Sequence, residues 1–196
     1  MASPERPAVR RRHAVFPASR AGLLDSGLRR FFNRPDRLAE RYLRPGDRVL
    51  DVGCGPGFFT RAFARQVGGD GRVYAVDLQE AMLDLLQKKL TPEGLMPRVT
   101  THRCRPDSLD LSPDLAGTFD AAFALFVVHE VPDPARLFRE VAALLRPGGT
   151  CYYTDPAYEV PGSEFREYVE LAAGAGLRPV DRPFSLLNRV AVLRKE

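Results

Sequence analysis

The stretch that decides the fold of this chain is Leu50-Asp51-Val52-Gly53-Cys54-Gly55-Pro56-Gly57-Phe58-Phe59-Thr60. The short aliphatic run over residues 48–52 predicts a buried strand, and a helix is expected over residues 58–67. Between them, three glycines at alternate positions allow a tight turn and a close approach of a ligand to the backbone. Strand, glycine loop and helix in this order are typical of α/β sheets that bind a ligand beyond the first strand.

Strand and helix continue to alternate toward the C-terminus. Further strands are expected over residues 72–76, 99–104, 119–128 and 150–154, and helices over residues 79–90, 135–145 and 164–173. Two extended runs within residues 178–194 are too close for a helix between them, so they are expected to form an antiparallel hairpin at the sheet edge. Because strands separated by helices need right-handed crossovers, we predict an α/β, Rossmann-like, doubly wound, mostly parallel seven-stranded sheet.

Three parts are expected along the chain. Residues 1–20 form a Pro- and Arg-rich arm with a charge of +4, which equals the net charge of the whole chain, and such an arm is expected to be flexible. Residues 21–43 predict two short helices, the second beginning at Pro35 and spanning residues 35–42. Residues 44–196 are expected to form the ligand-binding domain.

Composition excludes several classes of protein. No apolar run approaches the roughly 20 residues of a membrane-spanning helix. The three cysteines lie far apart without a CxxC pair, which argues against a disulfide framework and a zinc site. We therefore expect a cytoplasmic protein with buried, reduced thiols and no metal ion.

The glycine spacing distinguishes two kinds of cofactor loop. A dinucleotide loop reads G-x-G-x-x-G, whereas here Gly57 comes one position early and Phe58 stands in place of the last glycine. An acid, Asp51, also lies two residues before Gly53. This pattern resembles the first motif, D/E-x-G-x-G-x-G, of class I S-adenosylmethionine-dependent methyltransferases. A tight turn with a purely structural role is the alternative.

The resemblance extends over residues 50–150. Asp77 ends the second predicted strand about twenty residues after the glycines, where a carboxylate can accept hydrogen bonds from ribose hydroxyls. Residues 119–134, FDAAFALFVVHEVPDP, are similar to the fourth-strand motif of small-molecule methyltransferases, and residues 144–150, LLRPGGT, to the turn into their fifth strand. The sequence looks most similar to the group that includes ubiquinone and menaquinone C-methyltransferases.

The resemblance implies cofactor-binding roles for the first loop. Gly53, Gly55 and Gly57 would frame the methionine part of S-adenosylmethionine, with Asp51 beneath them. Cys54 would line the same loop through its backbone.

The other cofactor contacts implied by the resemblance follow later strands. Asp77 would hold the ribose, Leu78 would pack on the adenine face, and the backbone carbonyl of Leu125 would face the ammonium group. Many relatives carry an acid near the adenine amino group, where this chain has Arg105. Either Asp107, two residues later, or a backbone amide is expected to make that contact.

His129 is the candidate catalytic residue, a general base on the acceptor side, because imidazole titrates near neutrality. Many relatives have a second histidine where this chain has Glu130. Adjacent residues of an extended segment point in opposite directions, so Glu130 is not expected to orient His129. The alternative is a hydrogen-bonded histidine that stabilises the loop.

The resemblance also implies that residues 21–43 form a helical lid. Phe31 and Phe32, together with Phe16, would then either wall an apolar acceptor pocket or serve ordinary helix packing.

The sequence therefore predicts methyl transfer from S-adenosylmethionine to a small-molecule acceptor, with S-adenosylhomocysteine as product; it names neither the acceptor nor an oligomeric state. One alternative is methylation of RNA or protein aided by the basic arm, and another is a cofactor-binding partner protein without catalysis. An NAD-dependent oxidoreductase is disfavoured by Phe58 and by the lack of a Tyr-x-x-x-Lys pair. No magnesium-binding carboxylates follow the fourth predicted strand, which ends in Leu125-Phe126.

Overall fold

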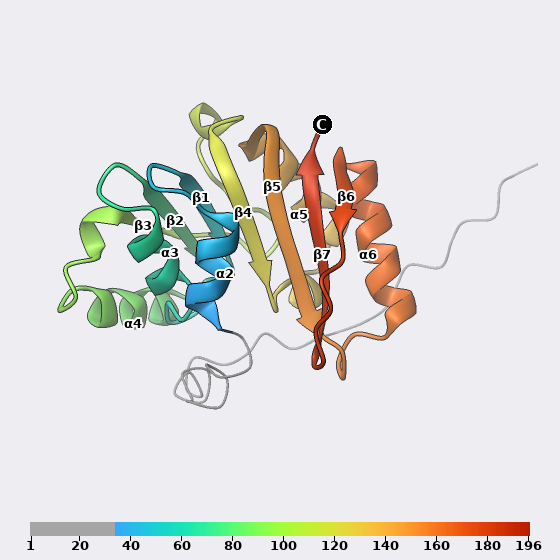
Figure 1. Cartoon of the computed structure of the whole chain (residues 1–196), viewed down its shortest axis with the longest axis horizontal. Helices are drawn as coiled ribbons and strands as arrows, with labels where there is room; N and C mark the ends of the chain where they lie inside the picture. The colour runs from blue at the N-terminus through green and yellow to red at the C-terminus, as the bar shows by residue number, and fades with distance from the viewer. Residues whose placement is uncertain (1–33) are drawn as a thin grey trace, which may run out of the picture.

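The computed structural model describes residues 34–196 (Figure 1). The strands are β1 (Arg48–Val52), β2 (Arg72–Asp77), β3 (Val99–Arg103), β4 (Phe119–Leu125), β5 (Leu145–Pro156), β6 (Leu177–Asp181) and β7 (Asn188–Lys195). The helices are α2 (Pro35–Tyr42), α3 (Thr60–Gln66), α4 (Glu80–Leu90), α5 (Pro134–Leu144) and α6 (Gly162–Gly174). The predicted arm, the helix expected within residues 21–32 and the aromatic residues Phe16, Phe31 and Phe32 lie outside the described residues.

The strands form one seven-stranded sheet in the order β3-β2-β1-β4-β5-β7-β6. The pairs from β3 to β5 are parallel, and β7 is antiparallel to both of its neighbours, β5 and β6. The predicted doubly wound sheet and its C-terminal edge hairpin are confirmed. The order reverses between β1 and β4, which is where such sheets bind ligands.

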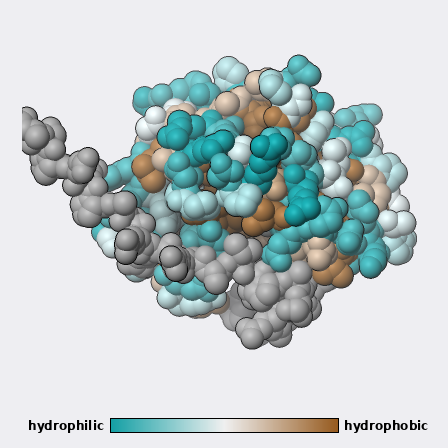
Figure 2. All heavy atoms as spheres, turned by 180° about the vertical axis from the view of Figure 1, so that it is seen from behind, coloured by the Kyte–Doolittle hydropathy of each residue, from teal (hydrophilic) through white to brown (hydrophobic). Residues whose placement is uncertain are grey.

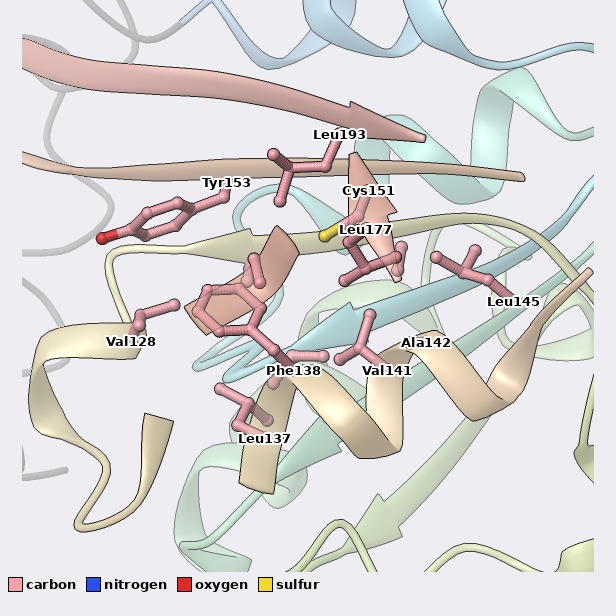
Figure 3. Close-up of a cluster of buried hydrophobic side chains, with 14 of the residues drawn as sticks. Val128, Leu137, Phe138, Val141, Ala142, Leu145, Cys151, Tyr153, Leu177 and Leu193 are labelled. Carbon is pink, nitrogen blue, oxygen red and sulfur yellow. The ribbon is translucent and has the colours of Figure 1, made fainter. Parts of the chain in front are cut away.

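Helices cover both faces of the sheet, because successive strand residues point to opposite sides. Val49 packs in the core that includes residues of α2, α3 and α4, and the next residue, Leu50, packs in the core that includes residues of α5 and α6. Figure 3 shows the second core, in which Leu137, Phe138 and Val141 of α5 face the sheet. The result is a three-layer arrangement of helix, sheet and helix.

Three predicted boundaries were wrong. The strand expected over residues 119–128 ends at Leu125, because Phe126 adopts a left-handed conformation with φ of 62° and Val128–Glu130 forms a short 3-10 turn. The helix expected from residue 58 begins at Thr60.

The strand expected over residues 150–154 is longer than predicted, since β5 already pairs with β4 through Leu145 and Phe119. A shift of register between Phe119 and Ala121 accommodates the intervening residues. The sequence Pro147-Gly148-Gly149 therefore lies within an irregular strand and does not separate the helix from it.

The surface drawn in Figure 2 is mostly hydrophilic, with hydrophobic residues in separate patches. Within residues 34–196, no helix is both long enough and apolar enough to cross a bilayer. The same part of the chain contains no cluster of three His, Cys, Asp or Glu side chains suited to a metal ion.

Candidate functional site

A cavity of about 740 Å³ lies at the carboxyl ends of β1, β2 and β4. Its volume falls within the roughly 300–1,000 Å³ of small-molecule pockets. Eight of the site residues predicted from the sequence line this cavity: Gly53, Cys54, Gly55, Asp77, Leu78, Arg105, Leu125 and His129. Asp51 and Gly57 do not line it; they support the loop that does.

The loop after β1 is tied to the end of β2. The N–H groups of Gly53 and Cys54 both donate to the carbonyl oxygen of Val76, at 2.8 and 3.0 Å. Gly53 has φ of +67°, and a Cβ there would lie 2.6 Å from a methyl carbon of Val127. Only glycine satisfies both requirements, so the first glycine brings the loop against the segment that follows β4.

The other two glycines of the loop differ in their surroundings. Gly55 has φ of +53°, and a Cβ there would meet nothing within 4 Å. At Gly57, where φ is +85°, a Cβ would lie 2.9 Å from Leu86 of α4. Gly57 thus allows close packing under the loop, whereas Gly55 leaves the cavity open above it.

Asp51 lies beneath the loop, as expected, and is only 2% exposed. It accepts a hydrogen bond of 2.6 Å from the hydroxyl of Thr60, the first residue of α3. Burial raises the pKa of Asp51 to about 7, against the opposing effect of the Thr60 hydrogen bond. This carboxyl therefore joins the end of β1 to the helix that follows the loop.

Asp77 connects the glycine loop to β2 and α4. One carboxylate oxygen accepts the N–H of Gly55 at 2.8 Å, and the other accepts the N–H of Gln79 at 2.9 Å. Burial raises the pKa of Asp77, while the backbone donors of Gln79, Gly55 and Leu78 act in the opposite direction. A carboxylate has about four lone-pair sites, so these three backbone donors leave room for a further hydrogen bond from a ligand.

Charged side chains at the rim after β3 are engaged with one another. Arg105 pairs with Asp110 at 3.0 Å, and Asp107 pairs with Arg136 of α5 at 3.1 Å. Arg136 also pairs with Glu140 at 3.0 Å. The acid considered for the adenine contact is therefore part of an ion-pair network between this rim and α5.

The thiol of Cys54 has no sign of activation. The side chain is 7% exposed, and burial raises its pKa well above the ordinary range. The thiol stays protonated and donates to the carbonyl oxygen of Gly55 at 3.5 Å.

The wall contributed by β4 ends in an unusual backbone conformation. Leu125 is the last residue of the strand and is 5% exposed. Phe126, next in the chain, has φ of 62° and donates its N–H to the carbonyl oxygen of Thr154 at 2.8 Å. Bulky residues rarely adopt this conformation, and such strain is concentrated at functional sites. Its effect here is to end the strand at the edge of the cavity.

His129 lies at the other end of the cavity and is hydrogen-bonded, as the alternative interpretation of the sequence had it, but to partners that the sequence did not predict. Its Nδ1 is 2.6 Å from a carboxylate oxygen of Asp155, and the other oxygen of Asp155 accepts the hydroxyl of Tyr153 at 2.7 Å. Its Nε2 is 3.0 Å from the carboxylate of Glu159. A carboxylate of β5, Asp155, therefore holds Nδ1 of His129.

The carboxylates determine the charge of His129. Burial lowers its pKa, but the hydrogen bond that His129 donates to Asp155 and the charges of Asp155, Glu130 and Glu159 outweigh burial, so the pKa of His129 is raised. Burial also raises the pKa of Asp155, opposed by its bonds to His129 and Tyr153. A carboxylate 2.6 Å from Nδ1 and another 3.0 Å from Nε2 favour the protonated imidazole, which can donate from both nitrogens.

A sequence signal for Asp155 did exist. The predicted fifth strand ended at Thr154, which places Asp155 at the carboxyl end of a strand next to β4. The carboxyl ends of parallel strands share one edge, so Asp155 could have been assigned to the site. Glu159 follows in an irregular loop, and no such rule applied to it.

With this geometry established, comparison with known proteins is informative. The family described as "Methyltransferase domain" matches residues 49–149, which is more than half of the chain. The chain belongs to this family of class I S-adenosylmethionine-dependent methyltransferase domains. The matched residues of this methyltransferase domain run from β1 to the glycines of β5 and include the whole glycine loop.

Two named relatives are similar over the same region. The domain is 34% identical over 119 residues to a ubiquinone biosynthesis O-methyltransferase of Xanthomonas campestris pv. campestris, covering 61% of this chain and 47% of that protein. It is 36% identical over 107 residues to the ubiquinone/menaquinone biosynthesis C-methyltransferase UbiE of Hydrogenovibrio crunogenus, covering 55% of this chain and 41% of that protein. The chain spans about half the length of the curated relatives it matches.

A solved structure matches the whole domain. A SAM-dependent methyltransferase from Aquifex aeolicus superimposes with a TM-score of 0.82 at 25% identity, covering 93% of this chain and all of that one. The similarity of fold therefore extends beyond the residues matched by the family, to the C-terminal hairpin.

Proposed function

We propose that this protein transfers the methyl group of S-adenosylmethionine to a small-molecule acceptor, with S-adenosylhomocysteine as product. The observation that carries the proposal is one cavity with a glycine loop and Asp77 at one end and His129 at the other. Membership of the methyltransferase domain family and the fold of the Aquifex aeolicus enzyme support it. The relatives from Xanthomonas campestris pv. campestris and Hydrogenovibrio crunogenus, named as methyltransferases of quinone biosynthesis, support a small organic acceptor.

The residues at the glycine end fit the cofactor. The open space at Gly55 admits a ligand against the backbone, and Asp77 retains the capacity to accept a hydrogen bond from a ribose hydroxyl. Leu78 and Met82 give an apolar surface beside Asp77. When bound there, the cofactor supplies a methyl group on a positively charged sulfur.

The residues of this chain then act mainly by alignment. Leu125, Phe126 and Val127 form an apolar wall between the two ends of the cavity and exclude water from it. His129, held by Asp155, is the group that takes a proton at Nε2 when the acceptor must lose one, after Nε2 has given up its own proton.

The charge of the cavity favours a small organic acceptor over a nucleic acid. Its acidic lining residues are Asp77, Asp107, Glu130, Asp133, Glu140 and Glu159, and among the lining residues of the described chain Arg105 is the one arginine or lysine. Nucleic-acid binding depends on neutralising phosphates with basic side chains. Such a lining repels phosphate groups.

Calorimetry on the full chain with S-adenosylmethionine, S-adenosylhomocysteine and NAD tests the proposal. We expect both adenosyl compounds to bind and NAD not to. Asp77→Asn should weaken their binding roughly tenfold or more, because hydrogen bonds to a charged group contribute about 1.5–3 kcal/mol. The matched control is Asp84→Asn, which changes an exposed carboxylate of α4 that does not line the cavity.

Transfer itself is measured with a labelled methyl group and a panel of phenols, quinols, thiols, amines and transfer RNA. We expect label in a small molecule. Preferential binding of NAD would contradict the cofactor assignment. Binding of the adenosyl compounds without transfer to any acceptor would favour a partner protein that has no catalysis, and label in transfer RNA alone would contradict the small-molecule acceptor.

A further inference from the structure

The two ring nitrogens of His129 have different partners. Nδ1 faces a fully buried carboxylate, and Nε2 faces a partly exposed one. Its side chain is 4% exposed, and that of Asp155, bound to Nδ1 at 2.6 Å, is fully buried. Asp155 is in turn held by the hydroxyl of Tyr153, which is also fully buried. Replacing the partner at Nδ1 would require opening the core, so exchange of partners is confined to Nε2.

The partner at Nε2 is of a different kind. Glu159 lies on the loop between β5 and α6, at the mouth of the cavity, and its side chain is 40% exposed. A half-exposed ion pair of this type contributes little to stability, because water can solvate the carboxylate once the pair has separated. Glu159 can therefore leave Nε2 while Asp155 stays.

We propose that Glu159 holds the place of the acceptor's oxygen. The acceptor is a molecule with an apolar body and an ionisable hydroxyl, a phenol or an enol, whose oxygen binds Nε2 of His129 after Glu159 has moved away. This inference rests on the proposed function, since it names the class of acceptor for the same cavity.

The charges on the two partners match. With Glu159 in place, the cation on His129 lies between two carboxylates, Asp155 and Glu159, with Glu130 nearby. When Glu159 leaves, His129 loses an anionic neighbour, and its Nε2 proton passes to solvent water at the mouth of the cavity, which leaves a neutral imidazole. The hydroxyl proton of the acceptor then passes to Nε2, and the oxygen keeps the electron pair of the broken O–H bond. The resulting pair of imidazolium and oxyanion has the same charges as the pair that it replaces.

The walls around Nε2 fit an apolar body. Val131 and Leu187 line the same cavity as His129, and so does Tyr158, the chain neighbour of Glu159, with 82% of its surface exposed. The loop that carries Tyr158 and the loop that carries Leu187 are joined by a hydrogen bond of 2.9 Å from the N–H of Ala157 to the carbonyl oxygen of Leu187. An aromatic ring can pack between these side chains with its hydroxyl toward His129.

The test uses 4-nitrophenol, whose phenolate absorbs visible light, added to the full chain saturated with S-adenosylhomocysteine. The matched compound is 4-nitroanisole, which has no ionisable proton. We expect 4-nitrophenol to bind roughly tenfold more tightly than 4-nitroanisole, because 4-nitroanisole cannot ionise and so lacks the charged hydrogen bond to His129. For the same reason, bound 4-nitrophenol should ionise at lower pH than it does in water. His129→Gln should abolish the shift in ionisation.

Glu159→Gln separates competition from structural support. A neutral amide competes less well for the imidazolium, so this variant should bind 4-nitrophenol roughly tenfold more tightly while its affinity for 4-nitroanisole stays unchanged. Glu167→Gln, at an exposed position of α6 away from the cavity, should behave as the parent chain. If His129→Gln does not fold, Glu159→Gln still decides the test, because Glu159 is partly exposed and its replacement leaves the core intact.

The outcomes separate the two proposals. If S-adenosylhomocysteine binds but 4-nitrophenol shows no preference over 4-nitroanisole, or if Glu159→Gln weakens its binding, the inference is overturned and the proposed function stands. If S-adenosylhomocysteine does not bind at all, both are overturned.

Discussion

The two ends of the cavity are built in different ways. The glycine end comes from residues 50–60 and Asp77, where backbone groups make most of the contacts. The histidine end comes from side chains that are distant in the sequence. His129 and Asp155, for example, are 26 positions apart and are brought together by the pairing of β4 with β5. A loop shaped by backbone conformation leaves a contiguous motif in the sequence. A site made by side chains of different strands leaves none.

The largest effect is expected at the histidine end, from Asp155→Ala. Removing one partner of a buried ion pair leaves the other uncompensated and should destabilise the fold by about 3–5 kcal/mol. Urea unfolding measures this free energy. Tyr153→Phe, which removes only the hydroxyl bonded to Asp155, should destabilise by about 1 kcal/mol. If Asp155→Ala lowered the free energy of unfolding by less than Tyr153→Phe does, the network would not stabilise the histidine end of the cavity.

At the glycine end, Gly53→Ala should destabilise by about 3 kcal/mol, because left-handed strain and the contact with Val127 both act against it. Urea unfolding again reports the difference. Gly69→Ala is the control: a Cβ there meets nothing within 4 Å, and its φ is not positive, so the change should stay within about 0.5 kcal/mol. Equal effects at Gly53 and Gly69 would contradict the tight contact between this loop and the segment after β4.

These two sites show what the sequence could and could not predict. The parallel sheet, its C-terminal hairpin and the glycine loop followed from local patterns, because alternation and glycine spacing are properties of neighbouring residues. The end of β4 did not, since nothing in the sequence indicates that a phenylalanine, Phe126, adopts positive φ. Nor did the bond between His129 and Asp155, which depends on the register of β4 against β5.

Gly55→Ala should separate binding from stability within the loop. Left-handed strain alone destabilises by about 1–2 kcal/mol, since no atom obstructs the new Cβ. Its methyl group would enter the cavity and should weaken S-adenosylhomocysteine binding roughly tenfold or more by overpacking, which typically costs about 1–3 kcal/mol. Calorimetry and urea unfolding on the same sample give both quantities. Unchanged affinity would show that the ligand does not approach this glycine.

The smallest effect is a pH dependence at the histidine end. The folded-state pKa of His129 is raised above its ordinary value of about 6.5, so protonation favours the folded state. Its contribution is complete below about pH 6.5 and is lost as the pH rises through the folded-state pKa. The stability difference between the parent chain and His129→Gln, measured by urea unfolding at several pH values, should shrink over that range. A difference that grows with pH would mean that His129 is neutral in the folded protein.

Hydrogen exchange with and without S-adenosylhomocysteine tests most directly whether the glycine end is the cofactor site. Backbone amides that a ligand covers or rigidifies exchange more slowly. We expect slower exchange in peptides that cover residues 52–59 and 77–82, and little change in those that cover residues 128–134. Protection confined to residues 128–134, with none in the glycine loop, would contradict this account.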